Sequence, residues 1–241
     1  MKSRYFLLLF FAAISAGFGQ VSNSASPQRV YKPSEVIDPS YGINRYDKLN
    51  YTLGGDSVRK DKKGYACQGW IEDSYVSGHP LHKGYYVDGK LKIFKNFYDN
   101  GQVERSYKIN DLKRSTMQIF YPDGKLKSNI EYLGTNAQKE EDFYPNGQTE
   151  FIEEYHKSMV YLIQRKSFFE NGKPASMLEL TDQRKKIYNQ KEYYENGSIK
   201  EEGQLIFNDK VGDYQKNGKW KTYDEMGKSL ADENYIDGQI N

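Results

Sequence analysis

A short turn signature recurs along this chain at a nearly constant interval, and this feature constrains the fold more than any other. Two aromatic residues are followed by Asn-Gly or Asp-Gly, sometimes with a proline between them, as in FYDNGQV, FYPDGKL, FYPNGQT, FFENGKP and YYENGSI. The glycines are Gly101, Gly124, Gly147, Gly172 and Gly197, with spacings of 23, 23, 25 and 25 residues. Gly78 marks a weaker copy 23 residues upstream. A period of this length is typical of an array of stacked structural repeats.

The chemistry of the turn predicts a β-hairpin in every repeat. Asn-Gly and Asp-Gly between apolar runs are the strongest short hairpin signals, since glycine adopts positive φ without a steric cost. Pro122 and Pro145 precede the pair in two copies. Proline has no N–H to donate but suits the second position of a type I turn. We therefore expect a three-residue loop, in which a type I turn is followed by glycine in the left-handed region.

Paired aromatic residues precede each turn and predict strands. Four residues before the glycine stand Phe97, Phe120, Phe143, Phe168 and Tyr193, and three residues before it stand Tyr98, Tyr121, Tyr144, Phe169 and Tyr194. Neighbours on a strand face opposite sides of the sheet, so one aromatic per repeat should enter the core while the other lies on the opposite face. A lone hairpin is marginal in water. The sequence therefore predicts an all-β fold, an elongated twisted antiparallel sheet of tandem 23–25-residue β-hairpin repeats.

The repeat resembles a known family. The unit FYxNGxLKxE, together with YQKNGKWKTYDEMGK near the C-terminus, is similar to the MORN repeat in its bacterial variant, over roughly residues 70–241. Most internal glycines of the usual MORN unit are replaced here. The resemblance implies an elongated β-sheet with an aromatic groove that binds proteins or membrane lipids. Bacterial relatives with such repeats are often labelled antitoxins of toxin–antitoxin systems.

The first residues predict export. Lys2 and Arg4 precede the ten apolar or aromatic residues Tyr5–Ile14, and small residues follow up to Gly19. This order is typical of a secretory signal peptide, and the apolar run is too short to span a bilayer. We expect a signal peptide, a flexible leader, an N-terminal cap, MORN-variant repeats and a C-terminal MORN-like cap, at residues 1–19, 20–45, 46–77, 78–212 and 213–241. No transmembrane segment is expected after the signal is removed.

Charge and cysteine content limit the classes of partner and the kinds of stabilisation that this chain can have. The chain has 35 basic and 33 acidic residues, and removal of Lys2 and Arg4 leaves 33 of each. Nucleic-acid-binding proteins usually have a basic excess, so we expect no nucleic-acid partner. Cys67 is the only cysteine, so disulfides within the chain cannot stabilise it. We expect Cys67 to be a small buried residue, with a reactive thiol or an intermolecular bridge as the alternative.

No motif predicts catalysis. His79 and His82 are three residues apart, but they flank Pro80 and lack further ligands nearby, so we expect loop histidines exposed to solvent, like His156, and no metal site. Nucleophile elbows, zinc-protease motifs and phosphate-binding glycine loops are absent from the sequence. The carboxylates of Glu140–Asp142, Glu153–Glu154 and Glu201–Glu202 alternate with lysines and are expected on a solvated strand surface. The sequence predicts neither an enzyme nor a cofactor.

The aromatic rows provide the best candidate site. Tyrosine combines apolar area with a hydroxyl and is enriched at interfaces, whereas cross-strand packing is the alternative role for such rows. The candidate binding face consists of Tyr98, Tyr121, Tyr144, Phe169 and Tyr194. We expect an exported scaffold that binds a protein of unknown identity at the cell envelope or outside, in the periplasm, on the cell surface or in the medium. The alternatives are an antitoxin or immunity-type protein, and a binder of glycan or lipid headgroups.

Overall fold

A computed structural model describes residues 49–50, 54–55 and 58–241 of the protein. The predicted signal peptide, the predicted leader and residues 46–48, 51–53 and 56–57 of the predicted N-terminal cap lie outside the described residues. The described residues form strands, turns and short irregular segments. They contain no helix with the length and apolar character that a membrane span requires.

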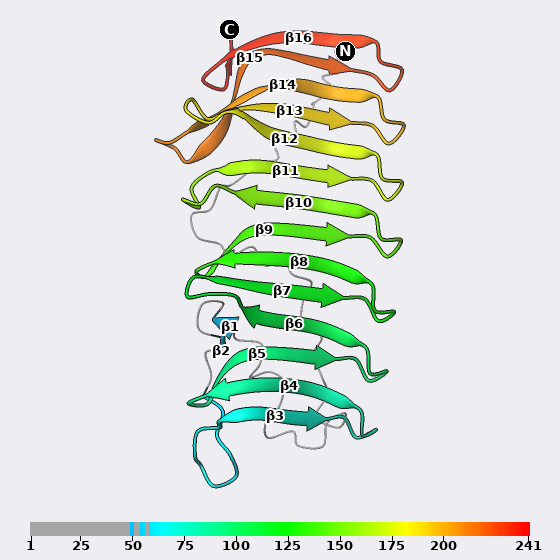
Figure 1. The fold of residues 1–241 in the computed structure, drawn as a ribbon. Helices are drawn as coiled ribbons and strands as arrows, with labels where there is room; N and C mark the ends of the chain where they lie inside the picture. Colours follow the sequence, from blue (N-terminus) through cyan, green and yellow to red (C-terminus); the bar gives the residue numbers. More distant parts are fainter. Residues whose placement is uncertain (1–48, 51–53, 56–57) are drawn as a thin grey trace, which may run out of the picture.

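One open antiparallel sheet of 15 strands makes up almost the whole described chain, as predicted (Figure 1). Strand order in the sheet is the same as order in the sequence, so every strand pairs with the strands immediately before and after it. Each repeat supplies two strands. The strands are β3 (Gly69–Ser74), β4 (Pro80–Val87), β5 (Lys90–Phe97), β6 (Val103–Ile109), β7 (Arg114–Phe120), β8 (Leu126–Leu133), β9 (Asn136–Phe143), β10 (Thr149–Tyr155), β11 (Leu162–Phe168), β12 (Pro174–Asp182), β13 (Ile187–Tyr193), β14 (Ile199–Asn208), β15 (Asp213–Tyr223), β16 (Ser229–Ile236) and β17 (Gln239–Ile240).

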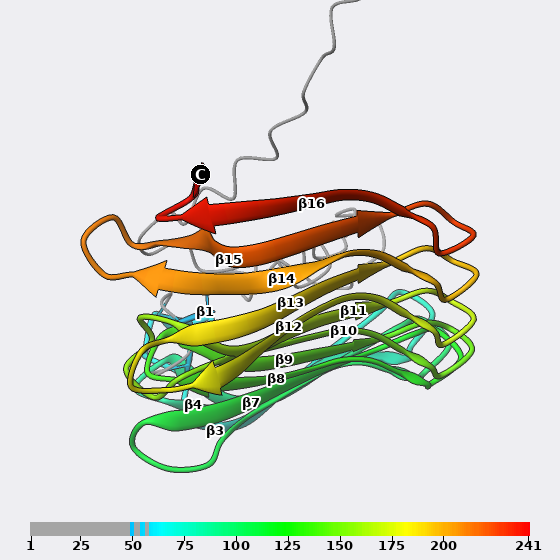
Figure 2. The same ribbon diagram turned by 90° about the horizontal axis from the view of Figure 1, so that it is seen from above.

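The sheet is twisted, and a small second sheet lies beside its N-terminal part. Viewed down the stack, the strands fan out rather than superimpose, as expected from the right-handed twist of β-strands (Figure 2). The second sheet pairs β1 (Leu49–Asn50) with β2 (Gly54–Gly55). Strand β2 lies against β5, so a segment from outside the repeats covers this region of the main sheet.

The loops at one rim of the sheet have the predicted geometry. In the β5–β6 hairpin the Tyr98 N–H donates to the Gln102 carbonyl at 2.8 Å, and the Gly101 N–H donates to the Tyr98 carbonyl at 2.9 Å. Gly101 has a φ of 82°, whereas Asp99 and Asn100 do not adopt positive φ. The same pattern recurs at the other four glycines of the strong repeats. The three-residue loop is therefore confirmed, and we call this edge of the sheet the loop rim.

Two hairpins at the opposite rim use a different turn. Asp88 and Gly89 have φ angles of 49° and 72°, and Asp237 and Gly238 have φ angles of 50° and 82°. Positive φ at both central residues is the signature of the two-residue type I′ turn. The similar sequences YVDGKL and YIDGQI, which contain these two pairs, therefore form the same turn at the rim opposite the loop rim.

Strand register divides the side chains between two faces of the sheet. We call inner the face that carries one continuous cross-strand row, consisting of Phe94, Tyr107, Met117, Ile130, Glu140, Glu153, Arg165, Leu178 and Gln190. The outer face carries the alternate row, consisting of Ser106, Gln118, Asn129, Glu141, Ile152, Lys166, Met177, Lys191 and Glu202. The outer row is mostly polar, so the buried side chains gather on the inner face.

The inner face holds two separate hydrophobic cores. The N-terminal core is built around Phe94, Tyr107, Met117 and Ile130, each at most 1% exposed. The C-terminal core is built around Tyr161, Leu162, Tyr188, Phe207 and Trp220. Between them the inner row consists of the charged residues Glu140, Glu153 and Arg165. The two cores are therefore joined by strand pairing across a polar stripe.

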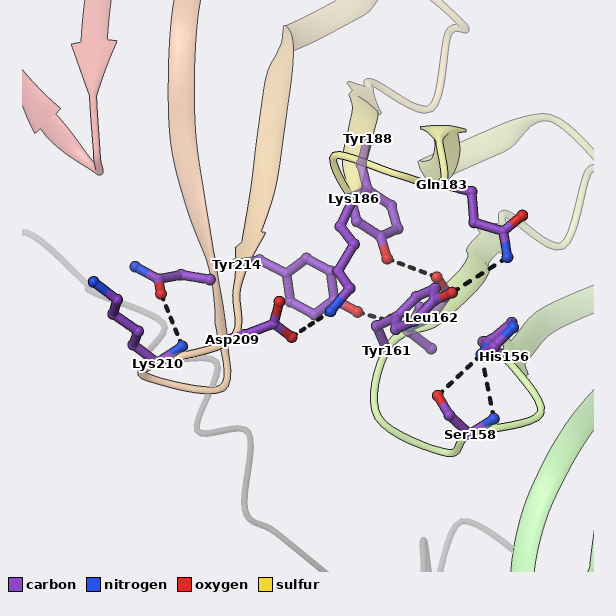
Figure 3. A network of polar contacts seen from close by, with 11 residues as sticks. His156, Ser158, Tyr161, Leu162, Gln183, Lys186, Tyr188, Asp209, Lys210 and Tyr214 are labelled. Atoms are coloured by element: carbon purple, nitrogen blue, oxygen red, sulfur yellow. Dashed lines mark hydrogen bonds and ion pairs between the residues drawn. The ribbon is translucent and has the colours of Figure 1, made fainter.

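The inner face curls inward around the C-terminal core. The Leu162 N–H donates to the Tyr214 hydroxyl at 2.9 Å, and the Tyr188 hydroxyl donates to the Leu162 carbonyl at 2.7 Å (Figure 3). Strands β11 and β15 are separated by three other strands. On a flat sheet that separation would be roughly 19 Å, beyond the reach of a tyrosine side chain. The direct bond to Tyr214 therefore requires a curved sheet at this rim.

Candidate binding face

The predicted aromatic residues form a regular row along the loop rim. Tyr98 follows Phe94 and Asn96 at alternate positions, and these two residues are 1% and 7% exposed on the inner face. By the same alternation, all five predicted residues lie on the inner face, each one residue beyond the end of its strand. All five side chains are half-buried. The row thus shares its face with the two cores, while the preceding aromatics, such as Phe97, are half-buried on the opposite face, so the expectation of one fully buried aromatic in each pair was wrong. The role of the row as a binding face stays a prediction.

The hydroxyls of this row connect consecutive repeats. The hydroxyls of Tyr98, Tyr121 and Tyr144 each donate at 2.8 Å to a backbone carbonyl of the next repeat. The acceptor is the aromatic residue immediately before the next member of the row, namely Phe120, Phe143 and Phe168. Tyr194 makes the same bond at 2.9 Å to Tyr223. We call this series the hydroxyl ladder. Phe169 has no hydroxyl, so the ladder lacks a bond at that repeat.

The ladder has a further member that the sequence analysis did not single out. Tyr75 donates to the Phe97 carbonyl at 2.7 Å and stands three residues before Gly78, the glycine of the weak first copy. Its position relative to that glycine was the available signal. Asparagine side chains reinforce the loops, because Asn100, Asn146 and Asn196 each donate to a carbonyl of the next loop at 2.9 to 3.0 Å. The rings are therefore held at fixed positions before any ligand arrives.

The carboxylates expected on a solvated surface are divided between the two faces. Glu140 is 3% exposed on the inner face, and the neighbouring Asp142 is half-buried there. Burial raises the pKa of Asp142, whose carboxylate accepts a hydrogen bond from Ser128. The expectation of a solvated surface was wrong for these two residues. Adjacent residues of a strand face opposite sides, so each acidic doublet had to place one carboxylate on the aromatic face.

Outer-face charges are largely matched with one another. Lys139 pairs with Glu141 at 2.9 Å, Lys166 with Glu179 at 2.5 Å, and Lys191 with Glu202 at 3.0 Å. On the inner face, Arg165 pairs with Glu153 at 2.6 Å and Lys216 with Glu201 at 2.5 Å. Further carboxylates share the inner side of β9 and β10, where Glu150 and Asp142 both contribute to raising the pKa of Tyr121 after burial, the larger cause. The inner face is therefore aromatic and acidic around the polar stripe.

Cations of the chain itself bind to aromatic rings on this face. The Lys216 ammonium lies 3.9 Å from the Trp220 ring centroid, and the Lys186 ammonium lies 5.0 Å from that of Tyr161 (Figure 3). Each lysine also pairs with a carboxylate, Glu201 for Lys216 and Asp209 for Lys186. The combination of a ring face and a carboxylate is thus a recurrent seat for a cation in this fold.

The histidines and the cysteine have mainly structural surroundings. His82 lies in β4, is fully buried, bonds to Asn96 at 2.7 Å and stacks on Phe94, so the expectation of a solvated loop histidine was wrong for this residue. Burial lowers its pKa to about 4. Within the described part of the chain, no group of three histidine, cysteine or acidic side chains is arranged to hold a metal ion. Cys67 is buried in the N-terminal core, as predicted, and burial raises its pKa.

Comparison with known families agrees with this architecture. The model of the MORN repeat variant matches residues 115–133 and 189–206. Each match covers one hairpin of the sheet, β7–β8 and β13–β14. MORN repeats are in general non-catalytic motifs that bind proteins or membranes. A comparison with curated proteins found no match to this chain.

Proposed function

We propose that this chain, which carries repeats of the MORN variant type, is an exported, non-enzymatic scaffold that binds a protein partner at the cell envelope or outside the cell. The binding surface is the part of the inner face near the loop rim from β9 to β13, outside the C-terminal core. The observation that carries this proposal is a difference in exposure along a single face. The same row of the same sheet is covered in the N-terminal repeats and open in the C-terminal ones.

Strand register allows the exposure of side chains in one cross-strand row to be compared along the whole sheet. One inner row near the loop rim runs through Asn96, Arg105, Ile119 and Ser128, which are 2% to 7% exposed. The same row continues through Asp142 to Phe151, Ser167, Ser176 and Glu192, all of which are half-exposed. The open part contains Phe151 and lies beside the rings of Tyr144 and Phe169. Half-exposed aromatic side chains among polar ones are typical of protein interfaces.

Polypeptide already occupies this face at the other end of the sheet. Strand β2 lies against β5, and the segment that contains Arg59 and Cys67 is hydrogen-bonded to Gly89 at the opposite rim. The repeats therefore accept chain segments from outside the array on their inner face. This favours a protein as the partner of the open part.

A steric variant tests where the partner binds. Ser167→Trp adds a large ring to the open inner face, whereas Asn189→Trp adds the same ring to the outer face of β13. We expect chemical crosslinking with native-source lysate, using residues 20–241 as bait, to capture one dominant protein. Ser167→Trp should abolish that capture, and Asn189→Trp should preserve it. Equal capture by both variants would refute binding through the inner face.

Export is tested independently. Mass spectrometry of the intact protein, recovered from the envelope and medium fractions of the source cells, should show a chain that begins at Gln20. Recovery of the chain only from the cytoplasm, with residues 1–19 attached, would contradict export and leave the binding experiment unaffected.

A further inference from the structure

We propose that the open inner face binds an arginine- or lysine-bearing segment of the protein partner, and that the cationic side chain is bound at Tyr144 between the carboxylates of Asp142 and Glu150. This inference rests on the proposed function and specifies the chemistry of the partner. It follows from an internal example of the same recognition, from the residues around Tyr144, and from the charge of the face.

Arg59 provides the internal example. It belongs to a segment outside the repeats, yet its guanidinium makes two hydrogen bonds to the Asp73 carboxylate, at 2.7 and 2.8 Å. The same guanidinium lies 5.5 Å from the Tyr86 ring centroid and 3.4 Å from the Tyr86 hydroxyl. Asp73 of β3 lies directly opposite His82 of β4 in the strand register, on the inner face. A cation from a non-repeat segment is thus bound by a carboxylate and a tyrosine of the inner face.

The surroundings of Tyr144 supply the same two groups. Asp142 precedes Tyr144 on the inner face, and Glu150 stands at the register shift between Thr149 and Phe151, where two residues of β10 oppose Asp142 and alternation is interrupted. Glu150 is near enough to contribute, after burial, to the raised pKa of Tyr144. The Tyr144 hydroxyl is already bonded to the Phe168 carbonyl at 2.8 Å, which fixes the ring. Among the residues that the structure describes, no cation–ring contact involves Tyr144, whereas Lys127 lies 5.5 Å from the Tyr121 ring.

The charge of this region selects the sign of the ligand. Glu153 lies two residues beyond Phe151, the partner of Asp142, and is paired with Arg165, while Lys127 is near enough to Asp142 to oppose the rise in the pKa of its carboxyl. An anionic phosphate headgroup would be repelled by the remaining carboxylates, whereas a guanidinium or ammonium would be attracted. Of the two kinds of partner that MORN repeats bind, the inner face therefore favours a basic protein segment over an anionic membrane.

Two double variants on the same strands separate the faces. Asp142→Asn with Glu150→Gln removes two carboxylates from the inner face of β9 and β10. Glu141→Gln with Glu154→Gln removes two carboxylates from the outer face of the same strands, so the change in net charge is identical. The probes are a fluorescent peptide of alternating arginine and serine, the matching glutamate and serine peptide, and vesicles of phosphatidylserine and phosphatidylcholine. The full chain is titrated with each probe at low and at physiological salt.

We expect the arginine peptide to bind at least about tenfold more tightly than the glutamate peptide, since two or three charge pairs differ between them. The inner-face double variant should weaken that binding about fivefold, and the outer-face variant less than about twofold. Salt should weaken the wild-type complex. Circular dichroism confirms that both variants are folded.

Three outcomes would overturn the inference: equal affinity for the two peptides, equal losses in the two double variants, or binding to the anionic vesicles in preference to the arginine peptide. None of these decides the proposed function. A protein partner that Ser167→Trp excludes, and that binds Asp142→Asn/Glu150→Gln as tightly as wild type, would support the scaffold while refuting the basic segment. Failure of the wild-type chain to capture any protein would instead refute the scaffold.

Discussion

The N-terminal and C-terminal parts of the sheet use the same repeat but treat its inner face differently. In the N-terminal part the inner row is apolar, and Phe94, Tyr107 and Met117 are almost completely buried. In the C-terminal part the corresponding positions are Glu153, Arg165 and Gln190, which are half-exposed, with only Leu178 buried among them. Hydrogen bonding within and between the hairpins is alike in both parts. The difference shows that the repeat fixes the backbone, while the face residues decide which part is core and which is open.

The largest expected effect sharpens this contrast. Phe94→Ala should lower the free energy of unfolding by about 3 to 5 kcal/mol, because it leaves a cavity in a packed core. Phe151→Ala, on the open part of the same face, should lower it by only about 1 to 2 kcal/mol. Urea denaturation followed by fluorescence measures both. Equal losses would mean that the two parts are packed alike and would remove the basis for an open binding face.

A second comparison uses the histidines of the two parts. Burial lowers the pKa of His82 to about 4, whereas His156 is only half-buried, on a loop of the C-terminal part where its ring stacks on Tyr161. Below pH 6.5 the unfolded chain binds a proton that folded His82 does not. Stability contributed by neutral His82 is therefore complete above pH 6.5 and is lost as the pH falls toward about 4.

That loss should reach about 2 to 3 kcal/mol in urea unfolding measured across this pH range. His82→Gln should flatten the profile, and His156→Gln serves as the matched control. A profile in which both variants keep the wild-type slope would assign the pH dependence to other groups. NMR titration of the His82 ring gives the same result without any mutation.

The smallest expected effect concerns the hydroxyl ladder, which continues through both parts. Tyr144→Phe removes one hydroxyl bond and should cost about 1 kcal/mol. Phe169→Tyr places a hydroxyl at the repeat that lacks one, opposite the Tyr193 carbonyl, and should stabilise the fold by up to about 1 kcal/mol. Tyr65→Phe, at a residue 71% exposed and outside the ladder, is the control. Thermal unfolding of the three variants would contradict the ladder if Tyr144→Phe behaved like Tyr65→Phe.

Much of the candidate face could be anticipated, and the rest depended on the pairing of distant residues. The positions of Tyr98 and its equivalents followed from their distance to the turn glycine. The division of Glu140 from Glu141 was implicit in strand alternation, but which of them is buried depends on where the core lies. His82 looked like a loop residue because Pro80 precedes it, yet the proline starts β4 and the histidine packs on Phe94. The loop propensity of the residues around Pro80 was therefore outweighed by the packing of His82 in the core.

The sequence by itself determined the local geometry and its repetition. Glycine at a fixed interval, preceded by Asn or Asp, dictates positive φ and a tight turn, and these are properties of a few adjacent residues. Only the tertiary structure decided which part of the inner face is covered and how far the sheet curls. Both depend on contacts between residues far apart in sequence, such as Arg59 with Tyr86 and Leu162 with Tyr214. Local turn signals do not encode such contacts, because they form only when the whole array has been stacked.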